Sequence, residues 1–353
     1  MIGNLLVFLS SLRITVSCLL LLFILVFWGT VYQVQHGLYL AQKYFFESFC
    51  FWIIRGIPFP GGQLVLWVLF LNLLCAVFTR FKFNRHKIGI AFVHAGVFLF
   101  FISGFVTFQL CQETHLTLAE GDGSNLSESN KDWELAAWKT GTSEKEVTAY
   151  DTAPLKKGQS LDFSEFGFRL VPQVYYPNAG TSGSSLNPLK QEKEPEKNLP
   201  GGIFSLPETG QTLLLHGGDG SPVFVKIGGT QYAVSLRRKR LPLPFFLQLD
   251  DFHMEVHPGT DVARSYQSAV SVFSRGQPRK TVVSMNEPLR EKDFTFYQAS
   301  YAIDPAGREI STLAVVKNTG RLLPYIATFV LVLGLAVHTL LVAGRISAPQ
   351  VKA

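Results

Sequence analysis

The sequence predicts a polytopic α-helical membrane protein with four transmembrane helices and an inserted β-rich extracytoplasmic domain. Of its 353 residues, 47% are hydrophobic and 16% are charged, whereas about a quarter are charged in soluble domains. Four windows contain no Asp, Glu, Lys or Arg, namely 14–42, 56–79, 88–112 and 322–344. Each window is longer than the roughly 20 apolar residues that a helix needs to cross the hydrocarbon core. The residues between the third and fourth windows are polar and rich in short strand-like runs.

The first apolar run is interpreted as a retained transmembrane helix within 1–35. Arg13 precedes the run, as a basic residue precedes the apolar core of a secretory signal peptide. The run continues through Trp28-Gly29-Thr30 without the small-residue pattern of a cleavage site. An outer loop with an interfacial segment is expected at 36–61.

Charged residues divide the rest of the membrane part. The second helix is predicted at 62–79 and the third at 88–108, separated by a basic loop at 80–87. The fourth helix is predicted at 322–344, followed by a tail at 345–353.

Basic residues predict the orientation. Those placed on one side of the predicted membrane are Arg13, Arg80, Lys82, Arg85, Lys87, Arg345 and Lys352, and those on the other are Lys43, Arg55 and Arg321. The positive-inside rule then makes both termini and the 80–87 loop cytoplasmic. The net charge of +6 reflects this topology, and no nucleic-acid partner is expected.

The inserted domain, 109–321, shows alternating or β-branched runs separated by Gly, Pro, Asn and Asp. Strands are predicted at 166–176, 211–216, 222–227, 230–236, 245–257, 267–274, 280–285, 294–302 and 311–316. Such spacing is typical of a sandwich or open barrel. The polar stretch 178–202 is rich in Pro, Gly, Lys and Glu, which predicts a long mobile loop.

The sequence motifs predict no catalytic centre belonging to this chain alone. It contains no CxxC, CxxCH, GxxxxGK, GxSxG or HExxH. Cys50 and Cys111 both face outward in the predicted topology, so a disulfide between them is geometrically possible. Unpaired cysteines acting as small hydrophobic residues are the preferred interpretation.

Two histidines, His94 and His338, are interpreted as the only strongly polar side chains with a functional role inside the membrane segments. An ionisable residue there is a functional-site hypothesis, because burying it in lipid without a partner is costly. His94 lies seven residues from Lys87, and His338 lies seven residues from Arg345. At 1.5 Å per residue, both are expected about 10 Å below the same interface.

Small residues accompany both histidines. Gly96 follows His94 closely, and Gly334 lies one helical turn before His338. Small residues permit close helix approach or leave room for a flat cofactor, and neutral imidazole is a common axial ligand of haem iron. We therefore expect both histidines near a haem, as ligands or along its path. The alternative is two structural histidines hydrogen-bonded to neighbouring helices.

The remaining histidines carry weaker signals. His36 is interpreted as interfacial, and His115 and His216 as surface residues. His253 and His257 share a strand face with Glu255, a spacing that imitates a metal site, but the run also carries apolar partners and ordinary strand positions are preferred.

Three stretches resemble the ResB (CcsB) family of system II cytochrome c biogenesis proteins. The opening FLSSLRITVSCLLLLFILVFWGTVYQ is similar to that family's first span. HKIGIAFVHAGVFLFFISG resembles its histidine-bearing helix, with His-x-Gly at His94-Ala95-Gly96. MNEPLREKDFTFYQASYAIDPAG resembles the end of its outer domain. The resemblance is weak over 125–265, and VVKNTGRLLPY stands where the family often has an Asp-Pro-Gly turn.

The resemblance implies a role in presenting haem to apocytochrome c outside the cytoplasm. It implies a CcsA (ResC) type membrane partner, haem b bound or in transit, and haem-lyase chemistry shared with that partner. His94 would be the axial ligand of the haem iron, and His338 a second membrane histidine of the route. The protein would lie in the bacterial inner (cytoplasmic) membrane, in contact with its lipid, with the large domain on the periplasmic side.

Two other functions remain open at the level of sequence. One is a membrane-anchored receptor or assembly scaffold whose β domain binds a protein and whose histidines are structural. The other is a b-type electron-transfer subunit.

Overall fold

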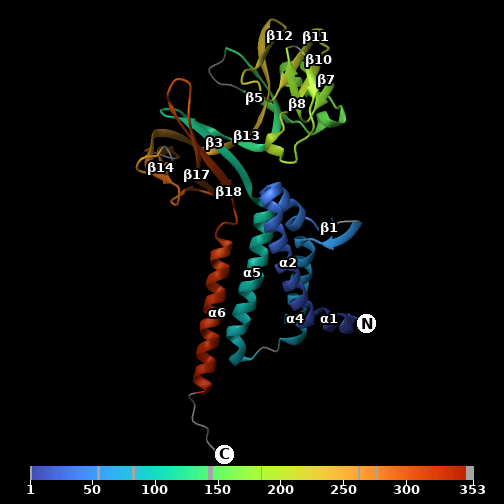
Figure 1. The fold of residues 1–353 in the computed structure, drawn as a ribbon, viewed down its shortest axis with the longest axis vertical. Coiled ribbons are helices and arrows are strands. Elements are labelled where there is room, and N and C mark those ends of the chain that lie inside the picture. The colour runs from blue at the N-terminus through green and yellow to red at the C-terminus, as the bar shows by residue number, and fades with distance from the viewer. Residues whose placement is uncertain are drawn as a thin grey trace, which may run out of the picture. The chain divides into compact units, whose positions relative to one another are not determined.

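The chain folds into two compact units (Figure 1). The computed structural model describes residues 2–53, 56–81, 84–141, 146–183, 185–260, 263–274 and 277–346. The helical unit comprises Met1–Cys111 and Asn318–Ala353, and the β unit comprises Gln112–Lys317.

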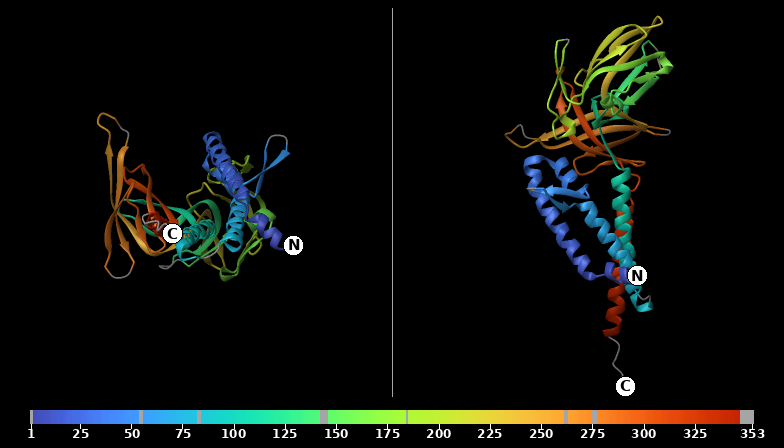
Figure 2. Two further views of the ribbon diagram at one scale, coloured as in Figure 1. Left: turned by 90° about the horizontal axis from the view of Figure 1, so that it is seen from below. Right: turned by 90° about the vertical axis from the view of Figure 1, so that its right-hand side faces the viewer.

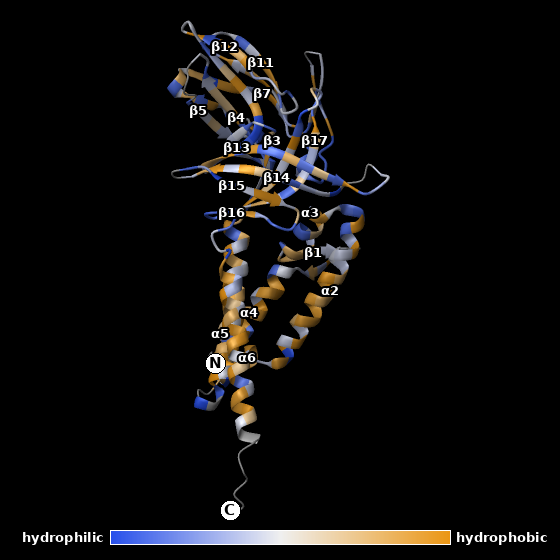
Figure 3. Cartoon of the chain, turned by 90° about the vertical axis from the view of Figure 1, so that its left-hand side faces the viewer, coloured by the Kyte–Doolittle hydropathy of each residue, from blue (hydrophilic) through white to orange (hydrophobic). Residues whose placement is uncertain are grey.

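The helical unit is built from α-helices and one small hairpin. The helices are α1 (Ile2–Leu9), α2 (Leu12–His36), α3 (Leu38–Ala41), α4 (Gly62–Arg80), α5 (Ile88–Leu110) and α6 (Leu323–Ile346), and the hairpin pairs β1 (Cys50–Ile53) with β2 (Ile57–Pro60). Four helices, α2, α4, α5 and α6, are long and apolar enough to cross a membrane. Figure 3 shows the apolar residues along these four helices.

The region 1–35 differs from the single helix predicted. The chain breaks after α1, and Ser11 caps α2 by accepting a hydrogen bond from the Arg13 backbone N–H at 3.3 Å. Ser10 donates its hydroxyl proton to the Val7 carbonyl at 2.9 Å. Serine favours such caps because its hydroxyl replaces a missing backbone partner, and hydropathy alone does not report this break.

An aromatic cluster holds the 36–61 segment against the end of α2. Gly37 ends that helix with φ of 82°, and the chain then passes through α3 and a π-helical turn, Gln42–Phe46. The Phe45 ring centroid lies 4.9 Å from that of Phe51 and 5.6 Å from that of Trp28. The β1–β2 hairpin is therefore fixed by ring packing, while Trp52 on its other face is 70% exposed.

The long helices associate as two pairs, α2 with α4 and α5 with α6. Figure 1 shows α5 and α6 running next to each other, and the two helices overlap in the right-hand view of Figure 2. Glycines make the second contact close. A Cβ built on Gly89 would lie 2.7 Å from the His338 Cα, and one built on Gly96 would lie 2.9 Å from the Leu331 backbone nitrogen. Neither position has space for a larger side chain without a helix shift.

The β unit is almost entirely strand. Its strands are β3 (Gln112–Ala119), β4 (Gly123–Lys139), β5 (Val147–Asp151), β6 (Leu161–Phe163), β7 (Phe168–Tyr176), β8 (Ala179–Ser182), β9 (Ser185–Pro188), β10 (Gly201–Leu206), β11 (Gln211–His216), β12 (Val223–Ile227), β13 (Thr230–Val256), β14 (Ala263–Phe273), β15 (Arg279–Ser284), β16 (Leu289–Glu291), β17 (Phe294–Ile303) and β18 (Glu309–Lys317). A ten-stranded sheet runs β15-β14-β13-β4-β3-β18-β17-β16, with β12 on β13 and β5 on β4. A four-stranded sheet has the order β11-β10-β7-β6.

Two hydrophobic cores form in this unit, and β13 contributes to both. Leu236, near the start of β13, is buried between the four-stranded sheet and the strands β4, β12 and β13. Leu247 and Leu249, further along β13, are buried with Val283 of β15 and Phe296 of β17. The first core has two facing layers, as in a sandwich. The second brings distant strands of one sheet together, so that sheet curls.

All nine predicted strands are present, but two of them are a single strand. The stretches 230–236 and 245–257 belong to β13, although a basic run and two prolines separate them. The basic run stays in the sheet because its charges pair across to β4. Arg237 Nε donates to Glu134 Oε1 at 2.9 Å, and Arg240 Nε donates to Glu128 Oε1 at 2.9 Å.

The prediction of a long mobile loop over 178–202 is wrong. The segment contains the β8–β9 hairpin and is anchored by Asn178, which is 7% exposed. The Asn178 amide donates to the Lys190 carbonyl at 2.7 Å and accepts from the Leu199 N–H at 3.1 Å. One buried asparagine thus orders a stretch whose composition is typical of disorder.

Candidate functional site

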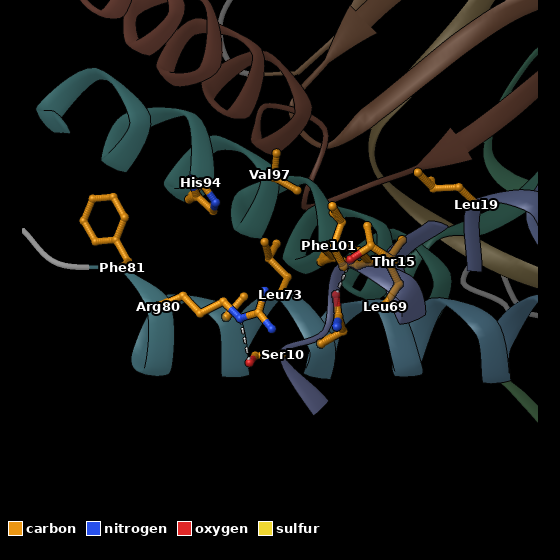
Figure 4. Close-up of a pocket in the computed structure, with 13 residues that line it drawn as sticks. Ser10, Thr15, Leu19, Leu69, Leu73, Arg80, Phe81, His94, Val97 and Phe101 are labelled. Carbon is orange, nitrogen blue, oxygen red and sulfur yellow. Dashed lines mark hydrogen bonds between the residues drawn. The ribbon is translucent and has the colours of Figure 1, made fainter. Parts of the chain in front are cut away.

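A pocket of about 510 Å³ opens in the helical unit between the α1–α2 break, α4 and α5 (Figure 4). Its walls are mostly apolar and include Leu12, Leu69, Leu73, Val97 and Phe101. Cavities of this volume and character hold small molecules and cofactors, with a few polar groups setting the ligand's orientation. The polar groups here come from α2, α4, α5 and Ser10 of the break.

His94 lies on α5 with its ring toward this pocket (Figure 4). Its Nδ1 lies 2.8 Å from the Ile90 carbonyl oxygen. A carbonyl only accepts, so Nδ1 carries the proton, and in the neutral ring Nε2 keeps its lone pair. Nε2 has no hydrogen-bond partner among the described residues. Metal-bound histidines usually donate their other ring N–H to a carbonyl or carboxylate, so His94 fits an iron ligand.

A polar network forms the wall beside the α1–α2 break. The Asn72 side-chain amide on α4 donates to the Leu9 carbonyl at 2.5 Å and to the Ser11 carbonyl at 3.0 Å. The Thr15 hydroxyl donates to Asn72 Oδ1 at 2.6 Å. Asn72 thereby satisfies the Leu9 carbonyl, which the break removes from helical bonding. It also adds a second donor to the Ser11 carbonyl, which accepts from the Ile14 N–H at 3.1 Å, and so it fixes this wall.

Arg80 extends along the same side of the pocket from the end of α4 (Figure 4). Its Nε donates to Ser10 Oγ at 3.1 Å. Phe81, the next residue, places its ring centroid 6.0 Å from that of His94. A cation, an aromatic ring and an imidazole therefore all line this pocket.

His338 lies on α6 against α5, and the expectation of matched depth is wrong. Gly89 of α5 is level with His338, whereas His94 is five residues further along α5. At 1.5 Å per residue the two histidines are offset by about 7.5 Å along the helix pair. The equal counts from Lys87 and Arg345 do not translate into depth, because the two helix ends are not level.

The His338 ring has an unusual environment. Its Nδ1 is buried and has no hydrogen-bond partner among the described residues. An unsatisfied buried nitrogen costs about 1–3 kcal/mol. His338 does not line the pocket described above.

Gly96 and Gly334 pack helix against helix. A Cβ on Gly334 would lie 2.6 Å from the Val93 backbone nitrogen, and one on Gly96 would lie 2.8 Å from the Leu331 Cβ. Small residues were expected either to permit close helix approach or to leave room for a cofactor. At these two positions the glycines permit close approach of α5 and α6. Their effect on a ligand would be indirect, through the placement of α5.

The other sequence candidates stand apart from the pocket. The His36 ring stacks on Tyr32 at 3.9 Å. Cys50 is exposed and forms no disulfide. Among the described residues, no group of three or more His, Cys, Asp or Glu could hold a metal ion, and this includes His253 with Glu255 and His257.

His216 is buried, contrary to its interpretation as a surface residue. Its Nε2 lies 2.9 Å from the Ala179 carbonyl oxygen, and its Nδ1 accepts from the Gly218 N–H at 3.1 Å. His115 is half-buried, with an unpartnered Nδ1 among the described residues. Both belong to the β unit's packing.

Sequence reasoning missed Asn72 and Arg80. Asn72 is a strongly polar side chain in the middle of a predicted span, and that position was itself a signal. Arg80 was counted only as a topological charge. The sequence did contain a signal for Arg80, because acidic residues that could pair with it are scarce. Glu47 is the only Asp or Glu within 1–111 and 318–353.

Comparison with models of protein families gives a match. The model of the ResB-like family matches residues 81–308, which is most of the chain. None of the curated proteins matches it.

Proposed function

The chain belongs to the ResB-like family, a membrane protein family associated with cytochrome c biogenesis, and from this premise we propose a haem-delivery role in system II maturation. In this proposal the protein holds haem b in its membrane unit as cargo. It is one subunit of a haem lyase complex that presents haem to apocytochrome c outside the cytoplasm.

His94 carries the proposal. It supplies a nitrogen lone pair in a largely apolar pocket, with its ring orientation fixed by the Ile90 carbonyl. Neutral imidazole in such surroundings is a common axial ligand of haem iron. Phe81 and Phe101 provide aromatic surface in the same pocket for a flat macrocycle. Bound haem would supply its iron. This iron must be in the reduced state when thioether bonds attach haem to apocytochrome c.

A CcsA (ResC) type subunit is the proposed partner. The pocket is lined by α4, α5 and the start of α2, together with residues of the break before it. Leu12 and Leu19 of the lining are more than half exposed in this chain alone. In the proposed complex, the partner would cover this side and would supply a second histidine to hold the haem. His338, about 7.5 Å from the level of His94 along the helices, would serve the route rather than the same iron.

The excess of basic residues at 80–87 supports an orientation with the β unit outside the cytoplasm. On this reading the protein lies in a bacterial inner membrane, and the β unit faces the periplasm and receives the apocytochrome. Its two hydrophobic cores support a folded surface for that contact.

The test is an absorption spectrum of the detergent-purified protein, alone and co-expressed with a CcsA-type partner. We expect a Soret band with split reduced bands in the wild type, strongly weakened in His94→Ala. His36→Ala is the matched control, because His36 stacks on Tyr32 outside the pocket.

An unchanged spectrum and unchanged cytochrome c yield in His94→Ala would contradict the assignment. Absence of haem in every preparation would instead favour a receptor or assembly scaffold. Haem that turns over with quinone would favour a b-type electron-transfer subunit.

A further inference from the structure

Arg80 is a cation without an acidic partner in its unit. Among the described residues that line the pocket, it is the only one with a permanent charge. Glu47, the single acid of the helical unit's sequence, follows the far end of α2. That helix has 25 residues and is therefore about 37 Å long. Glu47 is thus too far away to neutralise the guanidinium.

The Arg80 guanidinium makes its hydrogen bond through Nε, and the edge formed by its two Nη atoms is left without a bond to the described residues. Arg80 Nε donates to Ser10 Oγ, and Ser10 in turn donates to the Val7 carbonyl. Both Nη atoms have no hydrogen-bond partner among the described residues. The two Nη groups are the planar donors that bind a carboxylate in a bidentate manner.

The pocket therefore combines three chemistries. Leu69, Leu73 and Val97 offer apolar surface, His94 offers a metal-binding nitrogen, and Arg80 offers an anion-binding edge. A ligand that matches all three has a flat apolar body, a metal centre and carboxylates at its rim. Haem has this constitution, because its macrocycle carries two propionates.

We propose that Arg80 is the residue that binds the haem propionates, and that Ser10 positions its guanidinium for this contact. The inference rests on the proposed function, since it names the group that orients the same cargo. It extends the site from the helix that bears the histidine to α4 and the α1–α2 break. The charge of the carboxylates also supplies the counter-ion that the helical unit lacks.

The experiment compares two ligands in two proteins. Apo complex containing the CcsA-type partner is titrated with haem and with haem dimethyl ester, whose propionates are esterified, and binding is followed at the Soret band. A hydrogen bond to a charged group is worth about 1.5–3 kcal/mol, and 1.4 kcal/mol corresponds to tenfold in affinity. The wild type should therefore prefer haem over the ester by about 10- to 100-fold.

Arg80→Gln should remove this preference while leaving affinity for the ester unchanged. Retained ester binding also shows that the variant is folded. Arg80→Lys keeps the charge without the planar edge and should retain part of the preference. Arg13→Gln is the matched control, because it removes a positive charge that does not line the pocket, and it should behave as the wild type.

A wild-type preference that persists in Arg80→Gln would overturn the inference and leave the proposed function standing. Wild-type complex that binds neither ligand would overturn both. A lipid phosphate is the other possible anion. If Arg80→Gln loses a co-purified anionic phospholipid, measured by native mass spectrometry, and keeps its preference for haem, the anion is a lipid headgroup and the propionate assignment is wrong.

Discussion

Replacing Gly89 with alanine tests how tightly the α5–α6 pair is packed. The added Cβ would lie 2.7 Å from both the His338 Cα and the Gly334 carbonyl oxygen, whereas ordinary contact begins at 3.4 Å. Both neighbours are backbone atoms that cannot rotate away, and the His338 backbone nitrogen lies closer still, so the helices must separate by more than about 0.7 Å there. Overpacking of this kind typically costs about 1–3 kcal/mol.

Gly104→Ala on the same helix is the matched control. A Cβ at Gly104 meets nothing within 4 Å. Both variants gain the same helix propensity, about 1 kcal/mol for alanine over glycine, so their difference isolates the packing cost. We expect Gly89→Ala to be less stable than Gly104→Ala by about 1–3 kcal/mol.

The assay is reversible unfolding of the purified protein in mixed micelles, with the denaturing detergent as the variable. The same stability for Gly89→Ala and Gly104→Ala would refute the close packing of α5 on α6. The parallel pair on α6 is Gly334→Ala against Gly344→Ala, since a Cβ at Gly344 also meets nothing within 4 Å.

Three further predictions concern other parts of the chain. Asn178→Ala should destabilise the β unit by about 1–3 kcal/mol, because two backbone groups lose their side-chain partner. It should also open the 178–202 segment to proteolysis, whereas the exposed Asn187→Ala should do neither. Trp52, exposed on a hairpin at the end of a predicted span, should lie at the membrane interface. Brominated lipids in nanodiscs should then quench the fluorescence of Trp52, so the wild type should be quenched more than Trp52→Phe. Equal quenching of the wild type and Trp52→Phe would contradict the interfacial position. The backbone N–H and side chain of Arg308 hold the pKa of Asp304 below its usual value. This contribution to stability is therefore present above the usual carboxyl pKa and is lost as the pH falls through the lowered value. Asp304→Asn should show a smaller loss of thermal stability on acidification, and an identical loss would refute the pairing.

The membrane helices were predictable because their signal is local. A window without charges and longer than 20 residues has few alternatives to a spanning helix. The break at Ser10 was not visible to that criterion, because serine is compatible with both a span and a cap. Asn72, which donates to the Leu9 carbonyl beside the break, lies 63 positions further along the sequence, and only the fold brings the two together.

The strands were predictable wherever apolar residues alternate, and the errors fall where long-range contacts override composition. The basic run in β13 looked like a boundary, yet Glu134 and Glu128 of β4 neutralise it inside the sheet. The polar stretch 178–202 looked mobile, yet Asn178 pins it through two backbone groups. In the first case the residues that decide the structure belong to another strand. In the second case a single buried side chain decides it.

The candidate site was predictable in part. His94 stood out because an imidazole inside a span requires an explanation. Its depth relative to His338 depends on the register of two antiparallel helices, which is set by Gly89 and Gly334. Counting from flanking charges cannot supply that register. Arg80 was hidden because basic residues near span ends already have a topological explanation.

The most direct test of the His94 assignment is imidazole rescue of His94→Gly in the proposed complex with a CcsA-type partner. We expect the variant to lose the Soret band, and we expect added imidazole to restore it by occupying the space of the missing ring and binding the iron. A His94→Gly complex that holds haem at the wild-type level without imidazole would contradict the account, because the iron would then take its ligands elsewhere.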